Sequence, residues 1–519
     1  MFDLIEAPWI PVVQGDGTVR EVGLREALVS AHAFRGVRDP WPTIEFGVYR
    51  LLTAVSLDLL FGQEEGPPDR YRLFDTIEAG RFDRPQVEQY FDRYRDLFDL
   101  FSPSRPFLQS PGLDQLETKP VALLVHAIPS GTNANHFYHR QEREFAVSPA
   151  VAARLLTTLA PFTTEGGRGY SPSVNGAPPW YVLIKGDTLF ETICLNLLAP
   201  EELPGVPAWR NPAPPGGEKR TTTTYAEALT WRPRRVRLLP DKGGICAVTG
   251  IESTVLVREM QFGPGDSWGD SPRWTDPNAA YRTTAQGTSA IRPTEGRALF
   301  RDLGPLALKR QTETTNVKVR FERPLVVSQY ERLVDDNVLP ADRDLRLVVY
   351  GMRVEQKSKV YEWQREELPP LSFSTVHDPR VGTAAQGAIE RAEDGAFALR
   401  AAISRLAGKN ASGIGTLVAQ AHQIFWSALE PPYVHLVRAL GRAYAANNLE
   451  AVEQALAEFD RTLRLEAWRA FDEVVEPFDA TGRMLERVTT ARGDLAARLN
   501  RLGTGGPSKK REKEVKNGT

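Results

Sequence analysis

Residues 345–363 read LRLVVYGMRVEQKSKVYEW, and this stretch says more about the fold than any other. Apolar residues fill its two ends, whereas its centre, residues 355–358, is Glu, Gln, Lys and Ser. An apolar run that passes through a short polar segment into a second apolar run is typical of two strands joined by a turn. The stretch therefore predicts a projecting hairpin with Gln356 near its tip.

Cationic side chains are expected around this tip. They are Arg353, Lys357, Lys359 and Arg365. In nucleic-acid-binding proteins cations hold phosphates, while an uncharged amide can meet base edges or displace a base pair. The hairpin is therefore a candidate probe of a nucleic-acid duplex. The alternative is an ordinary solvated hairpin of an α+β protein, because short motifs of this kind also arise without function.

Length and charge limit the class of protein. The chain has 519 residues, too many for one hydrophobic core, so two or three domains are expected. Its 64 basic and 66 acidic residues give a formal net charge of -2, so any contact with nucleic acid must come from local basic patches and is expected inside an assembly. Cys194 and Cys246 are the two cysteines, which argues against a disulfide scaffold or a cysteine zinc site.

The N-terminal residues, MFDLIEAPWIPVV, carry acids where a signal peptide needs cations. No run approaches the ~18 apolar residues that a membrane span requires. A cytoplasmic protein that does not contact a membrane is therefore expected.

Residues 1–372 predict an irregular α+β domain. Residues 9–13 and 20–22 read as strands, and a helix is expected from Leu24. Helical spacing recurs at 44–60 and 149–159. Long Pro- and Gly-rich loops separate these elements, and the sequence has no repeating βαβ period, so a doubly wound sheet is not expected.

Residues 377–503 predict a four-helix bundle. Apolar residues recur every three to four positions at 452–475 and at 484–502, and helices also fit 384–406 and 415–443. The last of these is expected to break at Pro431-Pro432, because proline lacks an amide donor. Four amphipathic helices in sequence form a bundle. The polar, charge-rich residues 504–519 are expected to be a disordered tail.

The sequence offers little support for catalysis. The run Gly166-Gly167-Arg168-Gly169 lacks the following helix of a dinucleotide fingerprint, and no P-loop is present. His136 and His139 lack an identifiable third metal ligand. We therefore expect no catalytic residue, no metal and no cofactor. The alternative is a metal-dependent nuclease or another nucleic-acid-processing enzyme that uses one or more of four acids, although a flanking proline and arginine favour a solvated connection there. These acids are Asp335, Asp336, Asp342 and Asp344.

Two loops have compositions suited to ligand contact. Residues 131–140, GTNANHFYHR, combine amides, adjacent aromatic rings and an arginine, which is the combination that binds single-stranded RNA. Residues 163–176, TTEGGRGYSPSVNG, contain four glycines that let the backbone approach a ligand closely. We call residues 163–176 the glycine loop. The alternative for both is a flexible surface loop.

Together these features resemble the CasA family, the large subunit of the type I-E CRISPR surveillance complex called Cascade. The order and spacing of seven segments carry the resemblance, which covers nearly the whole chain. They are residues 4–13, 132–137, the glycine loop after Ala160-Pro161, 246–250, 274–281, 351–360 and the terminal bundle.

The resemblance implies a non-catalytic, antiviral subunit made of an α+β domain and a four-helix bundle. Its implied partners are crRNA, the other Cascade subunits, target double-stranded DNA and a nuclease-helicase effector. It implies recognition of the protospacer-adjacent motif (PAM), mainly from the minor groove, opening of the duplex on the way to an R-loop, and support for recruitment of the nuclease-helicase. A scaffold that contacts protein only remains a further alternative.

The resemblance also implies roles for individual residues. Gln356 matches the family's glutamine wedge and is flanked by Glu355 and Lys357, with Arg353 and Lys359 close by. Gly166, Gly167, Arg168 and Gly169 fall in the loop that approaches the minor groove. The residues implied to meet the crRNA 5′ handle and an adjacent subunit are Asn133, Phe137, Tyr138, His139 and Arg140.

Three features depart from the family pattern. Glu355 stands where the family has an amide, and a carboxylate cannot donate to base acceptors and repels phosphate. No lysine occurs at 281–294, where the family's lysine finger is expected, so Arg282, Gln286 or Arg292 is the candidate substitute. Cys246 stands alone where some members have a zinc-binding cluster, so no zinc is expected.

Overall fold

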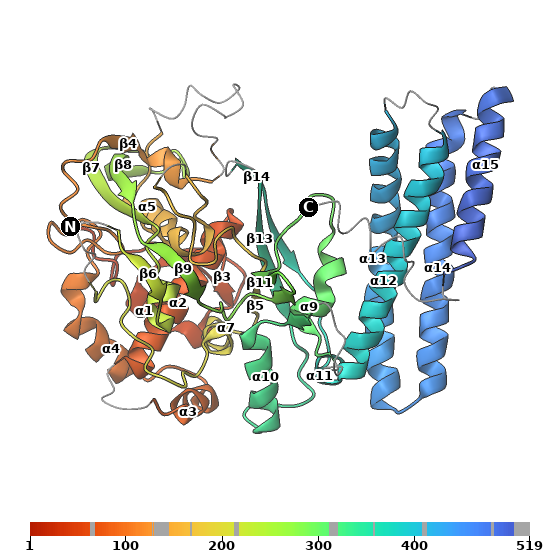
Figure 1. The fold of residues 1–519 in the computed structure, drawn as a ribbon. Helices are drawn as coiled ribbons and strands as arrows, with labels where there is room; N and C mark the ends of the chain where they lie inside the picture. Colours follow the sequence, from red (N-terminus) through yellow and green to blue (C-terminus); the bar gives the residue numbers. More distant parts are fainter. Residues whose placement is uncertain are drawn as a thin grey trace. The chain divides into compact units, whose positions relative to one another are not determined.

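The computed structural model divides the chain into two compact units, an α+β unit and a helical unit (Figure 1). Unit 1 comprises Met1–Thr294 and Lys318–Pro370, and unit 2 comprises Glu295–Val317 and Leu371–Thr519. The predicted fold class is confirmed. The structure describes residues 1–62, 68–126, 128, 145–166, 169–211, 217–310, 320–355, 359–406, 413–478 and 482–502, apart from the side chains of residues 270–273, 355, 359 and 361.

The described part of unit 1 contains small sheets rather than one large one. Antiparallel sheets have the orders β2 (Val19–Val22), β1 (Ile10–Val13), β3 (Gly36–Val37); β4 (Thr118–Pro120), β8 (Glu252–Pro264), β7 (Arg234–Ile245); β11 (Gly287–Ala290), β10 (Tyr281–Thr284), β12 (Arg320–Glu322); and β14 (Lys359–Glu367), β13 (Leu347–Glu355), β5 (Tyr181–Ile184). The strands β6 (Lys219–Thr222) and β9 (Ser267–Arg273) pair in parallel. This arrangement agrees with the predicted irregular α+β domain.

The helix α2 (Pro42–Phe61) lies at the centre of unit 1. Every residue from Thr43 to Phe61 is buried, which marks a helix covered on all sides. The Phe46 ring lies 4.5 Å from the ring of Tyr181 on β5 and 5.3 Å from that of Tyr350 on β13, so one residue joins the helix to the sheet. The other helices of this unit are α1 (Leu24–Val29), α3 (Tyr71–Ala79), α4 (Arg84–Arg93), α5 (Pro149–Thr157), α6 (Leu159–Phe162), α7 (Leu189–Asn196), α8 (Tyr225–Leu229) and α10 (Leu325–Asp335).

The predicted hairpin is present as β13 and β14. Residues 347–350 are all buried. The reason is position, because β13 is the middle strand of its sheet and also packs against α2. A register shift between Arg353 and Val354 marks a bulge where the hairpin leaves the sheet.

The described part of unit 2 consists mainly of four long helices, α12 (Pro379–Leu406), α13 (Ile414–Ala445), α14 (Leu449–Val475) and α15 (Gly482–Leu499), preceded by α11 (Phe373–His377). The predicted break at Pro431-Pro432 is wrong, because α13 runs through both prolines. Tyr433 is fully buried, and its ring packs against those of Phe300 and Phe459. Tertiary packing therefore overrides the local cost of proline. No helix among the described residues is long and apolar enough to cross a membrane.

A second difference concerns the segment before residue 318. The sequence-based division placed residues 295–317 in the first domain, whereas their contacts group them with the helices of unit 2. This segment includes α9 (Leu303–Ala307), and Leu299, Phe300 and Leu306 are buried. The Phe300 ring lies 5.6 Å from the ring of Tyr433 on α13. The predicted tail, residues 504–519, lies outside the described residues.

Candidate nucleic-acid interface

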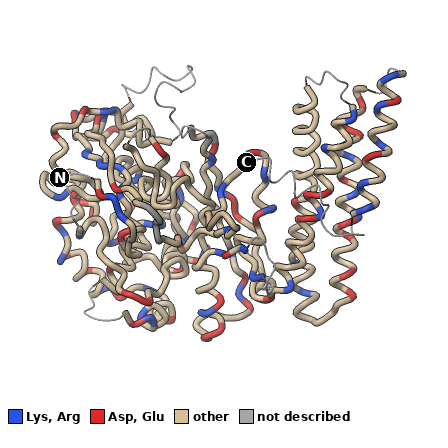
Figure 2. The backbone as a smooth tube through the Cα atoms, in the orientation of Figure 1, with Lys and Arg blue, Asp and Glu red and all other residues tan. Residues whose placement is uncertain are grey.

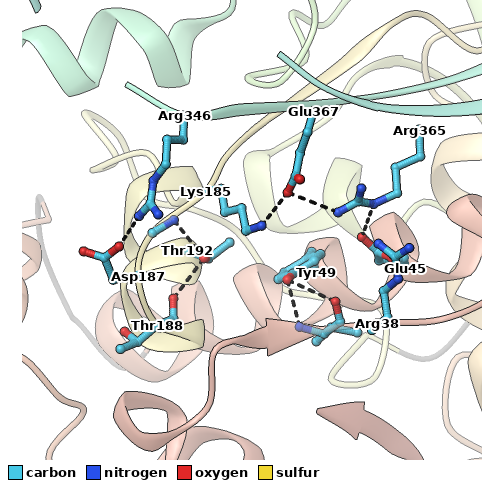
Figure 3. Close-up of polar contacts among 12 residues, drawn as sticks. Arg38, Glu45, Tyr49, Lys185, Asp187, Thr188, Thr192, Arg346, Arg365 and Glu367 are labelled. Atoms are coloured by element: carbon cyan, nitrogen blue, oxygen red, sulfur yellow. Dashed lines mark hydrogen bonds and ion pairs between the residues drawn. The ribbon is translucent and has the colours of Figure 1, made fainter. Parts of the chain in front are cut away.

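Ion pairs fix the base of the β13–β14 hairpin to its surroundings (Figure 3). Arg365 on β14 donates from Nε to Oε1 of the buried Glu45 on α2, at 2.8 Å. Glu367 pairs with Lys185 just after β5, and Arg346 just before β13 pairs with Asp187. The base of the hairpin is thus held by α2 on one side and by the residues that follow β5 on the other.

Arg365 therefore does not surround the hairpin tip, and that prediction is wrong. It lies opposite Tyr350 in the register, and Tyr350 also donates to Oε1 of Glu45, at 2.6 Å. Burial opposes the charge of Arg365, but hydrogen bonding to Glu45 and its negative charge outweigh burial and raise the pKa of Arg365. Burial and the neighbouring Glu45 carboxylate raise the pKa of Tyr350. Arg365, Tyr350 and Glu45 thus form a polar cluster inside unit 1.

The tip itself is described only in part. Arg353 lies opposite Glu362 and pairs with it at 3.4 Å between Nε and Oε2, so this cation is also engaged within the hairpin. Glu355 and Lys359 end the two strands and face each other in the register. Gln356 and Lys357 lie outside the described residues. The hairpin is confirmed, and the role of its tip stays a prediction.

A glycine brings the hairpin against the rest of the site. A Cβ added at Gly351 on β13 would lie 2.2 Å from Cζ3 of Trp180 and 2.8 Å from Cγ of Pro293. The indole of Trp180, which is 1% exposed, thus lies directly on the strand. The Trp180 amide donates to the carbonyl of Ile291 at 2.9 Å. Gly351 is needed here because any larger residue would meet the ring.

The described ends of the glycine loop are closed by backbone hydrogen bonds. The Gly166 amide donates to the carbonyl of Tyr170 at 3.2 Å, and the Ser173 amide donates to the carbonyl of Thr163 at 2.8 Å. Gly169 has a φ of 87° and is exposed, so this turn uses the left-handed region that favours glycine. Gly167 and Arg168 lie outside the described residues.

A buried polar cluster lies beneath the end of this loop. Arg50 of α2 and Asp276 form an ion pair at 2.9 Å with side chains 2% and 0% exposed. Asn175 of the glycine loop donates from Nδ2 to Asp276 at 2.8 Å and to the Tyr181 hydroxyl at 3.0 Å. Burial and the Asp276 carboxylate raise the pKa of Tyr181. The loop is thereby tied to the core of unit 1.

Sequence reasoning missed this cluster, although a signal for it exists. Arg50 is a lone cation in a helix that is otherwise strongly apolar, and buried charges require a partner. The partner lies 226 positions away in the chain (276 − 50), so no local pattern could identify it.

The three candidates for the lysine-finger position have different surroundings. Arg292 donates from Nε to the carbonyl of Ala177 at 2.9 Å and from Nη2 to that of Asn175 at 3.3 Å, so it holds the glycine loop. Arg282 on β10 and Gln286 in the β10–β11 turn are exposed. Of the three, Arg292 is thus committed to the backbone of the protein.

The nuclease alternative gains no support from the described residues. Asp335, Asp336, Asp342 and Asp344 are all exposed. In the described part of the chain no three His, Cys, Asp or Glu side chains are grouped so that they could hold a metal ion. Cys194 and Cys246 are buried free thiols. All five residues implied to meet crRNA lie outside the described residues, namely Asn133, Phe137, Tyr138, His139 and Arg140.

Charges are mixed along both units. Figure 2 shows Lys and Arg interspersed with Asp and Glu along the backbone. Many cations in unit 1 are paired with acids, as Arg365 and Arg353 are. Any surface that attracts nucleic acid would therefore have to be a local basic patch, as the near-neutral composition indicated.

Comparison with known proteins identifies clear relatives. The model of the family "CRISPR-associated protein Cse1" matches residues 3–470. The CRISPR-associated protein CasA/Cse1 of Thermus thermophilus is 29% identical over 532 residues, covering 97% of this chain and 98% of the relative. The solved structure of Thermus thermophilus CasA (Cse1) aligns with a TM-score of 0.72 and 27% identity, over 96% of this chain and 100% of that one.

Two more distant structures share the fold. Cse1 from Acidimicrobium ferrooxidans aligns with a TM-score of 0.73 and 23% identity, over 96% of this chain and 98% of that one. A chain of a structure described as a CRISPR RNA-guided surveillance complex aligns with a TM-score of 0.72 and 20% identity, over 95% and 99% of the two chains.

Proposed function

The chain belongs to the CRISPR-associated Cse1 family, and from this premise we propose that it is the large, non-catalytic subunit of an RNA-guided surveillance complex. Within that complex it recognises the PAM in double-stranded DNA and promotes opening of the duplex beside it. In such systems protein reads the short flanking motif, while base pairing with the guide RNA reads the rest of the target.

One observation carries the proposal. Three segments that are far apart in the sequence meet around Trp180 and Arg292. The hairpin contributes Gly351 against the Trp180 ring, and the segment after β11 contributes Pro293 and Arg292. The carbonyls that Arg292 binds come from Asn175 of the glycine loop and from Ala177 just after it. A probe and a close-approach loop that share one rigid support can act together on one duplex.

The proposal assigns a role to each segment. Gln356 is the wedge that separates the first base pair, and Lys357 and Lys359 hold phosphates beside it. Gly166 to Gly169 approach the minor groove, where side chains would obstruct the backbone. Arg282 and Gln286, which are exposed, remain candidates for reading base edges. The loop at 131–140 attaches the protein to crRNA and to an adjacent subunit.

The wider setting follows from the same proposal. The protein acts in the cytoplasm with crRNA and the other Cascade subunits, and the four-helix bundle supports recruitment of the nuclease-helicase. Glu355 beside the wedge repels phosphate, which favours a motif read from bases rather than from backbone at that position.

A binding selection tests the proposal. The complex is assembled with crRNA, with and without this chain, and is offered duplexes that carry a matched target beside randomised flanking bases. We expect a short flanking motif to be enriched only when the chain is present. The same flanking preference in both assemblies would show that motif recognition resides elsewhere.

A further inference from the structure

Arg234 joins the two sides of the glycine loop. It is the first residue of β7 and is 5% exposed. Its guanidinium donates from Nη2 to the carbonyl of Thr164 at 2.6 Å and from Nη1 to the carbonyls of Ser171 and Pro233. Thr164 and Ser171 flank the glycine-rich turn, so one planar group bridges the neck of the loop.

Aromatic packing holds this guanidinium in place. The Arg234 Cζ atom lies 5.1 Å from the centroid of the Tyr170 ring, which in turn stacks at 5.9 Å on Phe262 of β8. A Cβ at Gly166 would lie 3.0 Å from Nη2 of Arg234, so the loop fits closely over the cation.

Arg292 acts in the same way at the far end of the loop. It binds the carbonyls on both sides of Gly176, which has a φ of 73°. Among the described residues neither Arg234 nor Arg292 forms an ion pair with a carboxylate. Burial lowers the pKa of Arg234 to about 10, so it is still charged at neutral pH.

The missing carboxylates set these arginines apart from Arg50, which lies in the same region and pairs with Asp276. A carboxylate would compensate a buried cation more fully than carbonyls do. The buried charge of Arg234, 5% exposed, is therefore only partly compensated, and it favours an anion above the loop.

The orientation of the backbone at Glu165 also favours an anion above the loop. In a trans peptide the C=O and N–H groups point to opposite sides. Because the Thr164 carbonyl faces Arg234, the amide of the exposed Glu165 faces away from it. The positive end of this peptide dipole therefore points outward, as in loops that bind phosphate.

We propose that Arg234 and Arg292 are positioning residues that hold the described parts of the glycine loop, residues 163–166 and 169–176, in place to meet a DNA phosphate backbone. Arg292 thus serves the loop rather than replacing the lysine finger. This inference rests on the proposed function, because it assumes that the loop meets DNA. It assigns the loop's shape to the planar fork of arginine, which a lysine cannot reproduce.

Hydrogen exchange of the full chain tests the first half of the inference. In Arg234→Gln, peptides covering 163–176 should exchange about tenfold faster, whereas peptides of α2 should be unchanged. The amides of Gly166 and Ser173 report on the loop directly, since each donates to a loop carbonyl. Arg258→Gln, which removes an exposed ion pair on β8, is the control and should leave the loop unchanged. Wild-type exchange in the Arg234 variant would overturn the inference.

Duplex binding by the assembled complex tests the second half. The quantity measured is the ratio of affinities for duplexes with and without the flanking motif. Arg234→Gln and Arg234→Lys should both lower this ratio about tenfold, because Lys keeps the charge but cannot bridge Thr164 and Ser171. If Lys restores the wild-type ratio, charge alone suffices and the positioning role is refuted. Arg292→Gln, at an exposed residue, repeats the test if the Arg234 variants fail to fold.

Gly169→Ala separates this inference from the proposed function. The substitution strains the loop at a positive φ without touching either arginine. If Gly169→Ala lowers the ratio and Arg234→Gln does not, the arginines have no positioning role and the loop still meets DNA. If neither lowers it, the role of the loop in motif recognition fails, and the inference falls with it.

Discussion

Replacing Gly351 with Ala should loosen the support of the hairpin. The added Cβ would lie 2.2 Å from Cζ3 and 2.4 Å from Cε3 of Trp180. Carbon atoms in contact are about 3.5 Å apart, so the ring must move by about 1.3 Å. It has little freedom to do so, because Trp180 is 1% exposed and Pro293 lies 2.8 Å from the same Cβ.

Two opposing contributions set the size of the change in stability that Gly351→Ala causes. Overpacking of this kind costs about 1–3 kcal/mol. Replacing glycine with alanine inside a strand returns about 0.5–1 kcal/mol, because the unfolded chain loses less freedom. The clash wins, since β13 is paired on both edges and cannot shift away from the ring. We expect a net local destabilisation of about 1–2 kcal/mol, equivalent to roughly a 5- to 30-fold change in an equilibrium.

Hydrogen exchange is the appropriate assay, because a chain of two units has no single unfolding free energy. Peptides covering β13 and β5 should exchange faster by that factor in Gly351→Ala. Gly15→Ala is the matched control in the same unit, since a Cβ there meets nothing within 4 Å. Unchanged exchange across β13 would refute the reasoning from the Trp180 contact.

Three further outcomes are expected. Gln356→Ala should reduce strand opening more than docking, because a wedge acts on the separated pair, whose unstacking costs a few kcal/mol; a fluorescent base beside the motif measures this, and equal opening would exclude a wedge. Lys357→Glu with Lys359→Glu should flatten the salt dependence of complex binding by roughly 2 units of slope, and superimposable salt series would mean that the tip does not contact phosphate. Deleting residues 371–519 alone should give an insoluble chain, because Leu299 and Phe300 lose their cover, whereas deleting 295–317 as well should restore solubility; equal solubility of the two truncations would count against the observed division.

Local patterns predicted the elements whose signals are local. The strands at 9–13 and 20–22, the helix at 44–60 and the hairpin at 345–363 all lie where periodicity indicated. The predicted break at Pro431-Pro432 was wrong because the outcome there depends on a long-range contact rather than on a local pattern. Its outcome depends on Tyr433 packing against Phe300, and that contact joins positions 133 residues apart (433 − 300).

In the candidate site, too, local patterns were predicted and long-range contacts were not. The sequence indicated the hairpin and the glycine loop, but not the contacts that hold them. Trp180 and Arg234 carry no signal of their own, and Arg292 was a candidate for another role. Nor can a sequence show which cations are already used. Arg365 lies nine positions from Gln356 (365 − 356), yet it binds Glu45, and the cost of leaving that buried carboxylate unpaired keeps it there. The positive charge free at the hairpin tip is therefore smaller than the composition of the hairpin suggests, and the test of Lys357 and Lys359 asks whether the remaining charge binds phosphate.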